Sequence, residues 1–296
     1  MTIADLSSML FDRVRDLSAL CTRVGELSDE GIPFVLLAGG TDWMVEQEMR
    51  EPLASDVFPT VIDVSQMGEL RGIRLDGDIL RIGAATRYLE MRRHPAVLER
   101  APLLERMARD VGAIQIQARG TLGGNIATGS PAADGVAALA AFDALVVVKS
   151  RRGERHIPLS ELQTGYKTST RAPDEIIVAI EIYLPSRNAT WFWRKVGTRK
   201  AQAISKVALA AIAEVQGGQV VRCGLGMASV APVTALLPRT RELFLSTRLD
   251  AIDDFMIDKC VESDIQPITD VRSTGPYRLH VAKAVVREFA RSLGAA

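Results

Sequence analysis

The sequence predicts an α+β protein of two or three packed lobes. Its 296 residues approach the size at which a single hydrophobic core stops growing and a chain divides. Short apolar runs typical of buried strands alternate with stretches of helical spacing as far as residue 185. Beyond that point, three strand patterns joined by short turns are followed by helical patterns. This order predicts a mixed fold of sheets and helices.

The charge and hydropathy of the chain exclude several classes of partner. Its 36 Lys and Arg balance 36 Asp and Glu, so the charge gives no support for binding nucleic acid or an anionic membrane. The longest apolar stretch, residues 135–148, contains Asp143 and is shorter than the about 20 residues that a membrane helix needs. No signal-peptide core opens the chain. We therefore expect a cytoplasmic protein with no nucleic-acid or membrane partner.

The cysteines and histidines predict no metal centre in this chain. Cys21, Cys223 and Cys260 lie far apart, whereas an iron–sulfur cluster generally needs four thiolate ligands. An odd, small number of cysteines fits a reducing compartment. The three histidines are isolated from one another, so no zinc site is expected.

Strand and helix patterns divide the chain into three regions, 1–65, 66–185 and 186–296. The first contains an amphipathic helix with one break, from Leu6 to Leu27, and buried strands at 33–37 and 61–64. The second opens with a hairpin turned by Asp76-Gly77. It continues with helices at 86–93, 95–111 and 134–142, a strand at 145–148, an irregular polar segment at 158–174 and a half-buried strand at 176–182. The third contains strands at 191–196, 204–215 and 220–230, turned at Gly217-Gly218, and helices at 235–245, 252–261 and 277–293.

Two glycine-rich loops are the most informative feature. Gly39-Gly40 follows a buried strand, and Gly123-Gly124 precedes a small-residue helix. Such loops let the backbone approach a ligand closely and turn several N–H groups toward an anion. Neither loop has the spacing of a Rossmann turn or a P-loop. The pattern therefore leaves two interpretations open: a dinucleotide site, or tight turns with steric reasons alone.

The residues around these glycines resemble the flavin-binding loops of the FAD subunits of molybdenum hydroxylases. Leu36-Leu37-Ala38-Gly39-Gly40-Thr41-Asp42 resembles the first loop, and Gln115 to Asn125 resembles the second. The segment from Lys195 to Val207 is similar to one typical of xanthine dehydrogenase-like members. The resemblance runs from about Pro33 to the C-terminal helix and implies FAD as the cofactor. No histidine lies in either glycine loop, which argues against a histidyl link and for noncovalent FAD.

The same resemblance implies a fold of the PCMH/vanillyl-alcohol-oxidase type. Two α/β lobes would hold extended FAD between them, and a C-terminal α+β domain would pack beside the flavin ring. By position in the motifs, the implied FAD-binding residues are Val35, Leu36, Leu37, Ala38, Gly39, Gly40, Thr41, Asp42, Gly112, Thr121, Leu122, Gly123, Gly124, Asn125, Asp134, Ile177 and Lys195.

Three of these residues also have ordinary structural interpretations. The resemblance places Asp134 near the adenosine half of FAD, but an Asp there could also be a helix N-cap. It places Ile177 and Lys195 near the flavin ring. Ile177 could instead be a core residue, and Lys195 a solvated lysine on a strand face beside Arg194.

For function, the resemblance implies the medium, FAD-binding subunit of a heterotrimeric molybdenum hydroxylase. A large partner subunit would hold molybdopterin, and a small partner subunit would hold two [2Fe-2S] clusters. This chain would pass electrons from those clusters through FAD to NAD+ or another acceptor. The expected substrate of the complex is a purine such as xanthine or another N-heterocycle, and the expected assembly is a dimer of heterotrimers.

Three alternatives remain open at the level of sequence. The chain could be the FAD subunit of a carbon monoxide, aldehyde or nicotinate dehydrogenase. It could be a self-contained flavin oxidoreductase with the fold of vanillyl-alcohol oxidase and UDP-N-acetylenolpyruvoylglucosamine reductase, for which Tyr166 and Lys167 are the candidate acid–base residues. It could also be a nonenzymatic nucleotide-binding or scaffold protein.

Overall fold

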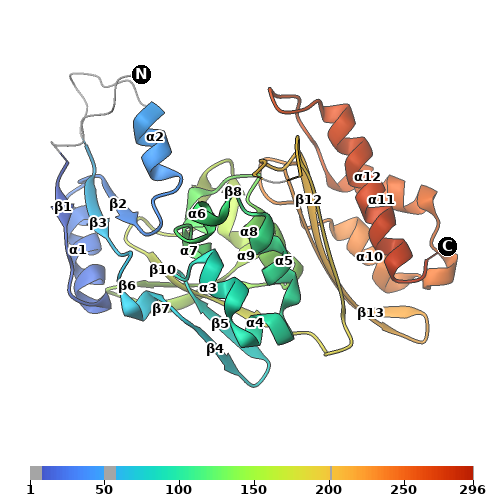
Figure 1. Ribbon diagram of the computed structural model, residues 1–296, viewed down its shortest axis with the longest axis horizontal. Coiled ribbons are helices and arrows are strands. Elements are labelled where there is room, and N and C mark those ends of the chain that lie inside the picture. The colour runs from blue at the N-terminus through green and yellow to red at the C-terminus, as the bar shows by residue number, and fades with distance from the viewer. Residues whose placement is uncertain (1–8, 50–57, 201, 296) are drawn as a thin grey trace.

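The computed structural model describes residues 9–49, 58–200 and 202–295. Figure 1 shows three layered regions in chain order, each built around its own sheet. A small parallel sheet lies at one end, a five-stranded sheet lies in the middle, and a three-stranded sheet with the C-terminal helices lies at the other end. The predicted α+β class is confirmed.

The first region differs from its prediction at the N-terminus. Its strands are β1 (Phe11–Asp12), β2 (Phe34–Leu37) and β3 (Thr60–Asp63), and its helices are α1 (Leu17–Asp29) and α2 (Trp43–Met49). Leu6, where the predicted helix starts, lies outside the described residues. The helix begins only at Leu17, because Asp16 caps it by accepting a hydrogen bond from the Ala19 N–H at 2.8 Å. The segment before it forms β1 and pairs with β3 in parallel.

The middle region is built on an antiparallel sheet in the order β4-β5-β10-β6-β7. The predicted hairpin is confirmed, with Gly77 in the left-handed region at φ 56°. The last strand is the central strand of the sheet. Its alternate residues Ile176, Val178, Ile180 and Ile182 are buried, as predicted, and Ala179 between them is buried too. The strands are β4 (Ile73–Asp76), β5 (Ile79–Gly83), β6 (Leu145–Ser150), β7 (Gly153–Pro158) and β10 (Ile176–Tyr183).

Helices cover one face of this sheet (Figure 1). The helix predicted over 95–111 is two helices, because Pro102 has no N–H to continue the first one. The segment expected to be irregular, 158–174, contains a short helix and a two-stranded sheet. The elements are η1 (Gly68–Leu70), α3 (Tyr88–Arg93), α4 (Pro95–Arg100), α5 (Pro102–Asp110), α6 (Ile114–Gln117), α7 (Leu122–Thr128), α8 (Asp134–Ala141), α9 (Leu159–Leu162), β8 (Gln163–Gly165) and β9 (Thr168–Ser169).

The third region matches its predicted order of three strands and then helices. Its antiparallel sheet is ordered β11-β12-β13 and turns at Gly217-Gly218, where both residues have positive φ. Here α8 of the middle region packs against β13. A Cβ atom on Gly224 or Gly226 would overlap backbone carbonyl oxygens of α8, so these glycines allow the close approach. The elements are β11 (Thr190–Val196), β12 (Val207–Gln216), β13 (Gln219–Ala228), α10 (Pro238–Ser246), η2 (Leu249–Ala251), α11 (Asp254–Asp264) and α12 (Gly275–Ser292).

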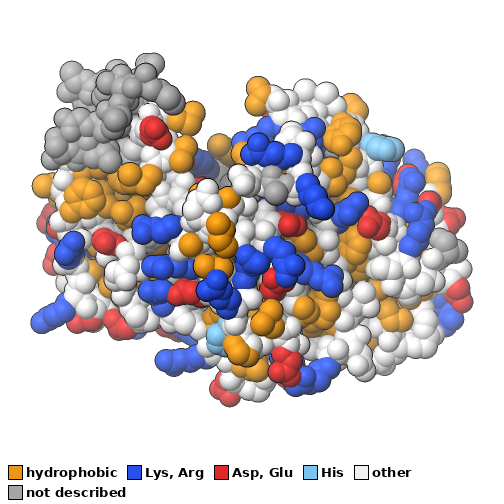
Figure 2. All heavy atoms as spheres, in the orientation of Figure 1, with side chains coloured by type: hydrophobic (Ala, Val, Ile, Leu, Met, Phe, Trp, Pro, Cys, Tyr) orange, Lys and Arg blue, Asp and Glu red, His pale blue; other side chains and the backbone are white. Residues whose placement is uncertain are grey.

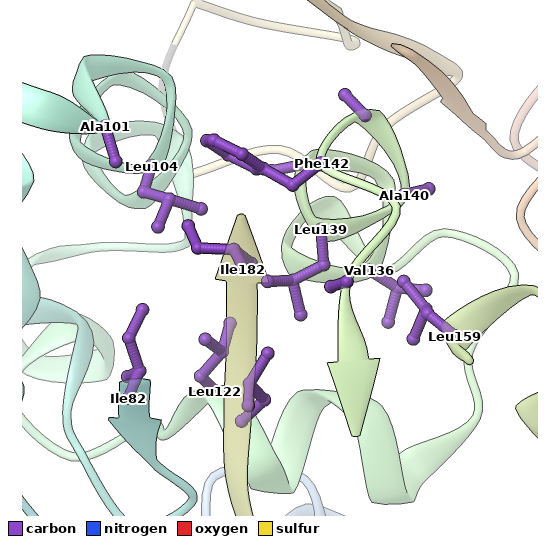
Figure 3. Packing of buried hydrophobic residues seen from close by; sticks show 14 of the residues in the cluster. Ile82, Ala101, Leu104, Leu122, Val136, Leu139, Ala140, Phe142, Leu159 and Ile182 are labelled. Carbon is purple, nitrogen blue, oxygen red and sulfur yellow. The ribbon is translucent and has the colours of Figure 1, made fainter. Parts of the chain in front are cut away.

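The main hydrophobic core fills the space between the middle sheet and its helices. Figure 3 shows Ile82 and Ile182 of the sheet on the side of Leu104 and Leu139 of the covering helices and of Phe142, the residue that follows α8. A second core lies between the third sheet and α10 to α12, and a third lies under α1. The main core and the core under α1 lie beside the walls of the cleft described below.

Two surface properties complete the description. Within the described residues, no helix is both long enough and apolar enough to cross a bilayer. Figure 2 shows Lys and Arg side chains gathered over the middle of the face drawn, although the formal net charge of the chain is zero.

Candidate flavin-binding cleft

A cleft with a volume of about 450 Å³ opens between the first region and the middle region, a size typical of sites for small molecules and cofactors. The segment from β2 into α2 forms one wall, and α7 with its flanking residues forms the other. The residues that line it are Val35, Leu36, Leu37, Ala38, Gly39, Gly40, Thr41, Asp42, Trp43, Glu46, Tyr88, Val111, Ile116, Gly120, Thr121, Gly124, Asn125, Ala127, Thr128 and Lys167.

The first glycine segment presents backbone N–H groups that no protein group uses. Among the described residues, the N–H groups of Gly39 to Asp42 have no hydrogen-bond acceptor. Gly40 adopts φ 70°, a left-handed conformation that reverses the chain between β2 and α2. Successive free N–H groups in such a turn form a concave site for an anion. This segment can therefore hold a phosphate.

The second glycine segment is helical rather than a loop, which corrects the sequence prediction. Thr121 caps α7 by accepting a hydrogen bond from the Gly124 N–H at 3.1 Å. The N–H of Leu122 donates to Thr86 O, and the N–H of Gly123 donates to Ala84 O. These three N–H groups are already paired, so they are not free to bind an anion. The sequence pattern of a capped helix start is the same as that of a glycine-rich turn. For this reason the segment was predicted as a loop.

The two glycine segments contact each other directly. A Cβ atom on Gly39 would overlap the backbone carbonyl oxygen of Arg119 and lie 3.0 Å from the Cα of Gly120. A Cβ atom on Gly123 would likewise overlap Ala84. Close backbone packing thus requires both glycines, whatever the cleft binds. The two interpretations drawn from sequence are compatible, because the contact that needs Gly39 also shapes the free N–H segment.

Two polar contacts join the walls across the cleft. Thr128 Oγ1 donates a hydrogen bond to Asp42 Oδ2 at 2.9 Å. Lys167 Nζ lies 3.1 Å from Glu46 Oε1, and this ion pair raises the pKa of Lys167. Lys167 is the one basic residue among the described residues that line the cleft. Both walls of the cleft therefore carry polar or charged side chains that can interact with a charged ligand.

A buried ion pair joins the middle region to the third. Asp134, the first residue of α8, accepts from Lys195 Nζ at 2.6 Å and from Ser205 Oγ at 2.6 Å. Lys195 also donates to the carbonyl oxygen of Asp110 at 2.8 Å. Burial raises the pKa of Asp134, while Lys195 and Ser205 lower it. The N-cap of α8 is Ala133, so Asp134 is not an N-cap, and Lys195 is not a solvated strand lysine.

The structure thus gathers most, but not all, of the residues that the sequence singled out. Val35 to Asp42 line the cleft together with Thr121, Gly124 and Asn125. Six of the residues lie outside its wall: Gly112, Leu122, Gly123, Asp134, Ile177 and Lys195. Ile177 packs against the main core. Asp134 and Lys195, which were expected at opposite halves of the cofactor, are instead direct partners.

Several residues of the wall were not found by sequence reasoning. Tyr88 and Thr128 carry no motif signal, because helices that are distant in sequence bring them to the cleft. Glu46 lies on α2, which was not predicted. Lys167 was considered only as an acid–base candidate. Among the described residues, no group of three or more His, Cys, Asp or Glu side chains could hold a metal ion.

Comparison with known proteins shows the family to which the chain belongs. Residues 13–185 match the family described as the FAD binding domain in molybdopterin dehydrogenase. This chain is an FAD-binding subunit of the molybdenum hydroxylase family. Residues 193–293 of this subunit match the CO dehydrogenase flavoprotein C-terminal domain. It is an FAD-dependent oxidoreductase subunit, as the resemblance implied.

Relatives of this FAD-binding subunit occur in several dehydrogenases. It is 35% identical to the nicotinate dehydrogenase FAD-subunit of Eubacterium barkeri over 60% of this chain and 59% of that protein. It is 28% identical to the putative xanthine dehydrogenase FAD-binding subunit of Escherichia coli (strain K12) over 86% of each. In structure it resembles reconstituted CO dehydrogenase from Oligotropha carboxidovorans, with a TM-score of 0.88 and 24% identity over 100% of both chains. This likeness confirms the predicted fold type.

The cleft of the subunit fits a flavin dinucleotide. The four free N–H groups from Gly39 to Asp42 provide a cradle for a pyrophosphate. Two buried polar atoms of the wall, the Tyr88 hydroxyl and Asn125 Oδ1, have no partner within the described chain. Since buried polar groups are nearly always hydrogen-bonded, unpaired ones in a cleft point to a ligand that supplies the partner.

Proposed function

We propose that this subunit works in a heterotrimeric molybdenum hydroxylase. It would accept electrons from [2Fe-2S] clusters of a small subunit and pass them through FAD to NAD+ or another acceptor. The observation that carries the proposal is the cradle of free N–H groups, set between two lobes of a chain that belongs to an FAD-binding family. When bound, FAD would supply two-electron redox chemistry, and the chain would bind and orient it without a covalent link.

Different residues of the chain would bind different parts of FAD. Gly39 to Asp42 would donate to the pyrophosphate, and Val35 to Ala38 would form the floor beneath it. Thr121, Gly124 and Asn125 would complete the opposite wall. Contacts of FAD with the six residues outside the wall stay predictions: Gly112, Leu122, Gly123, Asp134, Ile177 and Lys195.

A large molybdopterin subunit is the proposed site of substrate oxidation. The names of two relatives support an N-heterocycle as substrate, because one is a nicotinate dehydrogenase subunit and the other a putative xanthine dehydrogenase subunit. A purine such as xanthine is our first candidate. A carbon monoxide dehydrogenase medium chain is also among the relatives, so substrate assignment requires the partner subunit. We also propose a dimer of heterotrimers for the complete enzyme.

We propose three domains, 1–65, 66–185 and 186–296. In support, every sheet lies entirely within one of these ranges. We also propose a cytoplasmic location. The three cysteines, Cys21, Cys223 and Cys260, are all free thiols, as is usual in a reducing compartment.

A self-contained oxidoreductase is not favoured by any observation. Its candidate acid–base residues are Tyr166 and Lys167, but Lys167 is paired with Glu46 and Tyr166 is 64% exposed. Among the described residues, neither a histidine nor a cysteine lines the cleft.

Co-purification from the native host tests the proposed function. A tagged copy of this chain should bring down two partner chains, together with molybdenum, iron and one FAD per chain. The purified complex should reduce NAD+ or an artificial acceptor when given a purine, and removal of this chain should abolish that electron transfer. A tagged chain that binds no partner and oxidises a substrate without molybdenum would contradict the proposal.

A further inference from the structure

Tyr88 has a hydroxyl group that the protein alone does not use. It is the first residue of α3 and is only 3% exposed. Its backbone N–H donates to Gly120 O at 3.1 Å, which fixes α3 beside the second glycine segment. Its hydroxyl has no hydrogen-bond partner among the described residues. A buried hydroxyl without a partner destabilises a fold, and phenylalanine at this position would avoid that penalty.

The hydroxyl lies beside a second unpaired polar atom in the same wall. A Cβ atom on Gly135 would lie 2.5 Å from Asn125 Oδ1 and 3.0 Å from the Tyr88 hydroxyl. Glycine at the start of α8 therefore leaves room for both groups. Tyr88 and Asn125 both line the cleft, and both of these atoms are buried without a partner in the described chain. Both atoms thus lie next to Gly135 at the start of α8.

The position of the ring relates this polar pair to the cradle. The Tyr88 ring packs against Gly120, and Gly120 in turn packs against Gly39 of the free N–H segment. Burial, reinforced by the negative charges of Asp134 and Asp42, raises the pKa of Tyr88. The phenol therefore stays protonated and can donate a hydrogen bond at any physiological pH.

We propose that the Tyr88 hydroxyl donates a hydrogen bond to an oxygen of the chain that links the two ring systems of FAD. That oxygen belongs to the pyrophosphate or to the ribityl group, since the Tyr88 ring packs on Gly120, which contacts Gly39 of the cradle. Tyr88 is then a binding and positioning residue for the cofactor. The inference rests on FAD binding in this cleft and adds to it a residue outside both glycine motifs.

Substitution of Tyr88 by phenylalanine tests this inference, because it removes one oxygen and keeps the ring packing. Flavin fluorescence titration of the full chain should show that Tyr88→Phe raises the dissociation constant for FAD about tenfold, the effect of one lost hydrogen bond to a buried ligand. The melting temperature of the flavin-free variant should equal or exceed that of the wild type, since an unpaired hydroxyl has been removed. Tyr166→Phe, at an exposed tyrosine, should change neither quantity.

Two further ligands separate the possible acceptors. If the acceptor is the pyrophosphate, Tyr88→Phe should weaken ADP binding by the same factor as FAD binding. If it is the ribityl group, the variant should weaken riboflavin binding and leave ADP binding unchanged.

Results that contradict the role of Tyr88 can be distinguished from results that contradict the proposed function. Equal FAD affinity in Tyr88→Phe and wild type would overturn the inference while leaving the proposed function intact. A lower melting temperature of the flavin-free variant with unchanged FAD affinity would overturn it too, because the hydroxyl would then pair with Asn125 within the protein. A wild-type chain that binds no FAD would overturn the proposed function itself.

Discussion

Lys195 and Asp134 form a buried ion pair across the boundary between the middle and third regions. Their side chains are 10% and 9% exposed, and Lys195 Nζ lies 2.6 Å from Asp134 Oδ2. Asp134 is the first residue of α8, and Lys195 lies on β11. A buried pair of this kind stabilises a fold mainly through the penalty for removing one partner. It fixes how the C-terminal region sits on the flavin-binding lobes.

Lys195→Met should therefore be strongly destabilising. Loss of the ammonium leaves Asp134 buried without its counterion, which costs about 3–5 kcal/mol in the free energy of unfolding. Urea denaturation provides the measurement. The control is Arg194→Met, whose side chain is 56% exposed and 3.5 Å from Glu288, and it should cost less than about 1 kcal/mol. Adding Asp134→Asn to Lys195→Met should recover part of the loss; no recovery would show that the two residues act separately.

Gly39→Ala should disturb the contact between the two glycine segments. The new Cβ atom overlaps the Arg119 carbonyl, and relief of that overlap must move the backbone that carries the free N–H groups. We expect a loss of stability of about 1–3 kcal/mol and a flavin dissociation constant raised at least tenfold. Gly68→Ala has open space around its Cβ position and should alter neither. Tight FAD binding by Gly39→Ala would refute the role of this segment as the cradle.

Gly226→Ala tests the packing of β13 on α8. The added methyl group would meet the carbonyl oxygen of Ala137, so the sheet and the helix must separate. We expect this overpacking to cost about 1–3 kcal/mol in thermal or urea unfolding. In the control Gly165→Ala, the nearest atom to the new Cβ lies 3.8 Å away. If both variants have the same free energy of unfolding, the close approach of α8 to β13 does not require glycine at position 226.

Lys167→Gln and Glu46→Gln should change FAD affinity in opposite directions. The first removes the basic side chain of the cleft wall, which should weaken binding of a pyrophosphate. The second removes a negative charge and frees Lys167 from its 3.1 Å contact with Glu46, which should strengthen binding of the pyrophosphate. Because both side chains are about half exposed, salt should reduce both effects. Titrations at low and high ionic strength measure this, and changes of the same sign would count against the electrostatic explanation.

Acid stability should depend on Asp174. Arg152 donates two hydrogen bonds to it at 2.6 and 2.8 Å, and this pairing lowers the pKa of Asp174. Its folded pKa thus lies below the unfolded value of about 3.9, so the stabilisation is complete above that pH and is lost as pH falls through the folded pKa. Asp174→Asn should cost about 1 kcal/mol at pH 6, since the arginine is exposed. The difference from wild type should shrink by pH 2, and a difference that does not change with pH would contradict this assignment.

The order of elements was predictable because hydrophobic period and turn residues are local properties. The hairpin at Asp76-Gly77, the turn at Gly217-Gly218 and helix α8 all lie where the sequence indicated. Helix boundaries that depend on a cap or a proline were missed. Thr121 converts the predicted second loop into a helix start, and Pro102 divides a predicted helix in two.

The sequence predicted those residues of the cleft that belong to a recognisable motif. The first glycine segment lines the cleft as expected. Tyr88 and Thr128 could not be found in this way, because folding rather than spacing brings them there. The pairing of Asp134 with Lys195 also depends on how the third region packs onto the second, which no local pattern encodes.

Flavin content is the most direct test of the central claim. The full chain should be incubated with FAD, passed over a desalting column and assayed for bound flavin per chain, with Gly39→Ala treated in parallel. We expect one FAD per wild-type chain, yellow protein with flavin absorbance bands, and a much lower content in the variant. A colourless wild-type chain that takes up no FAD, or a variant that retains as much as the wild type, would contradict the assignment of this cleft.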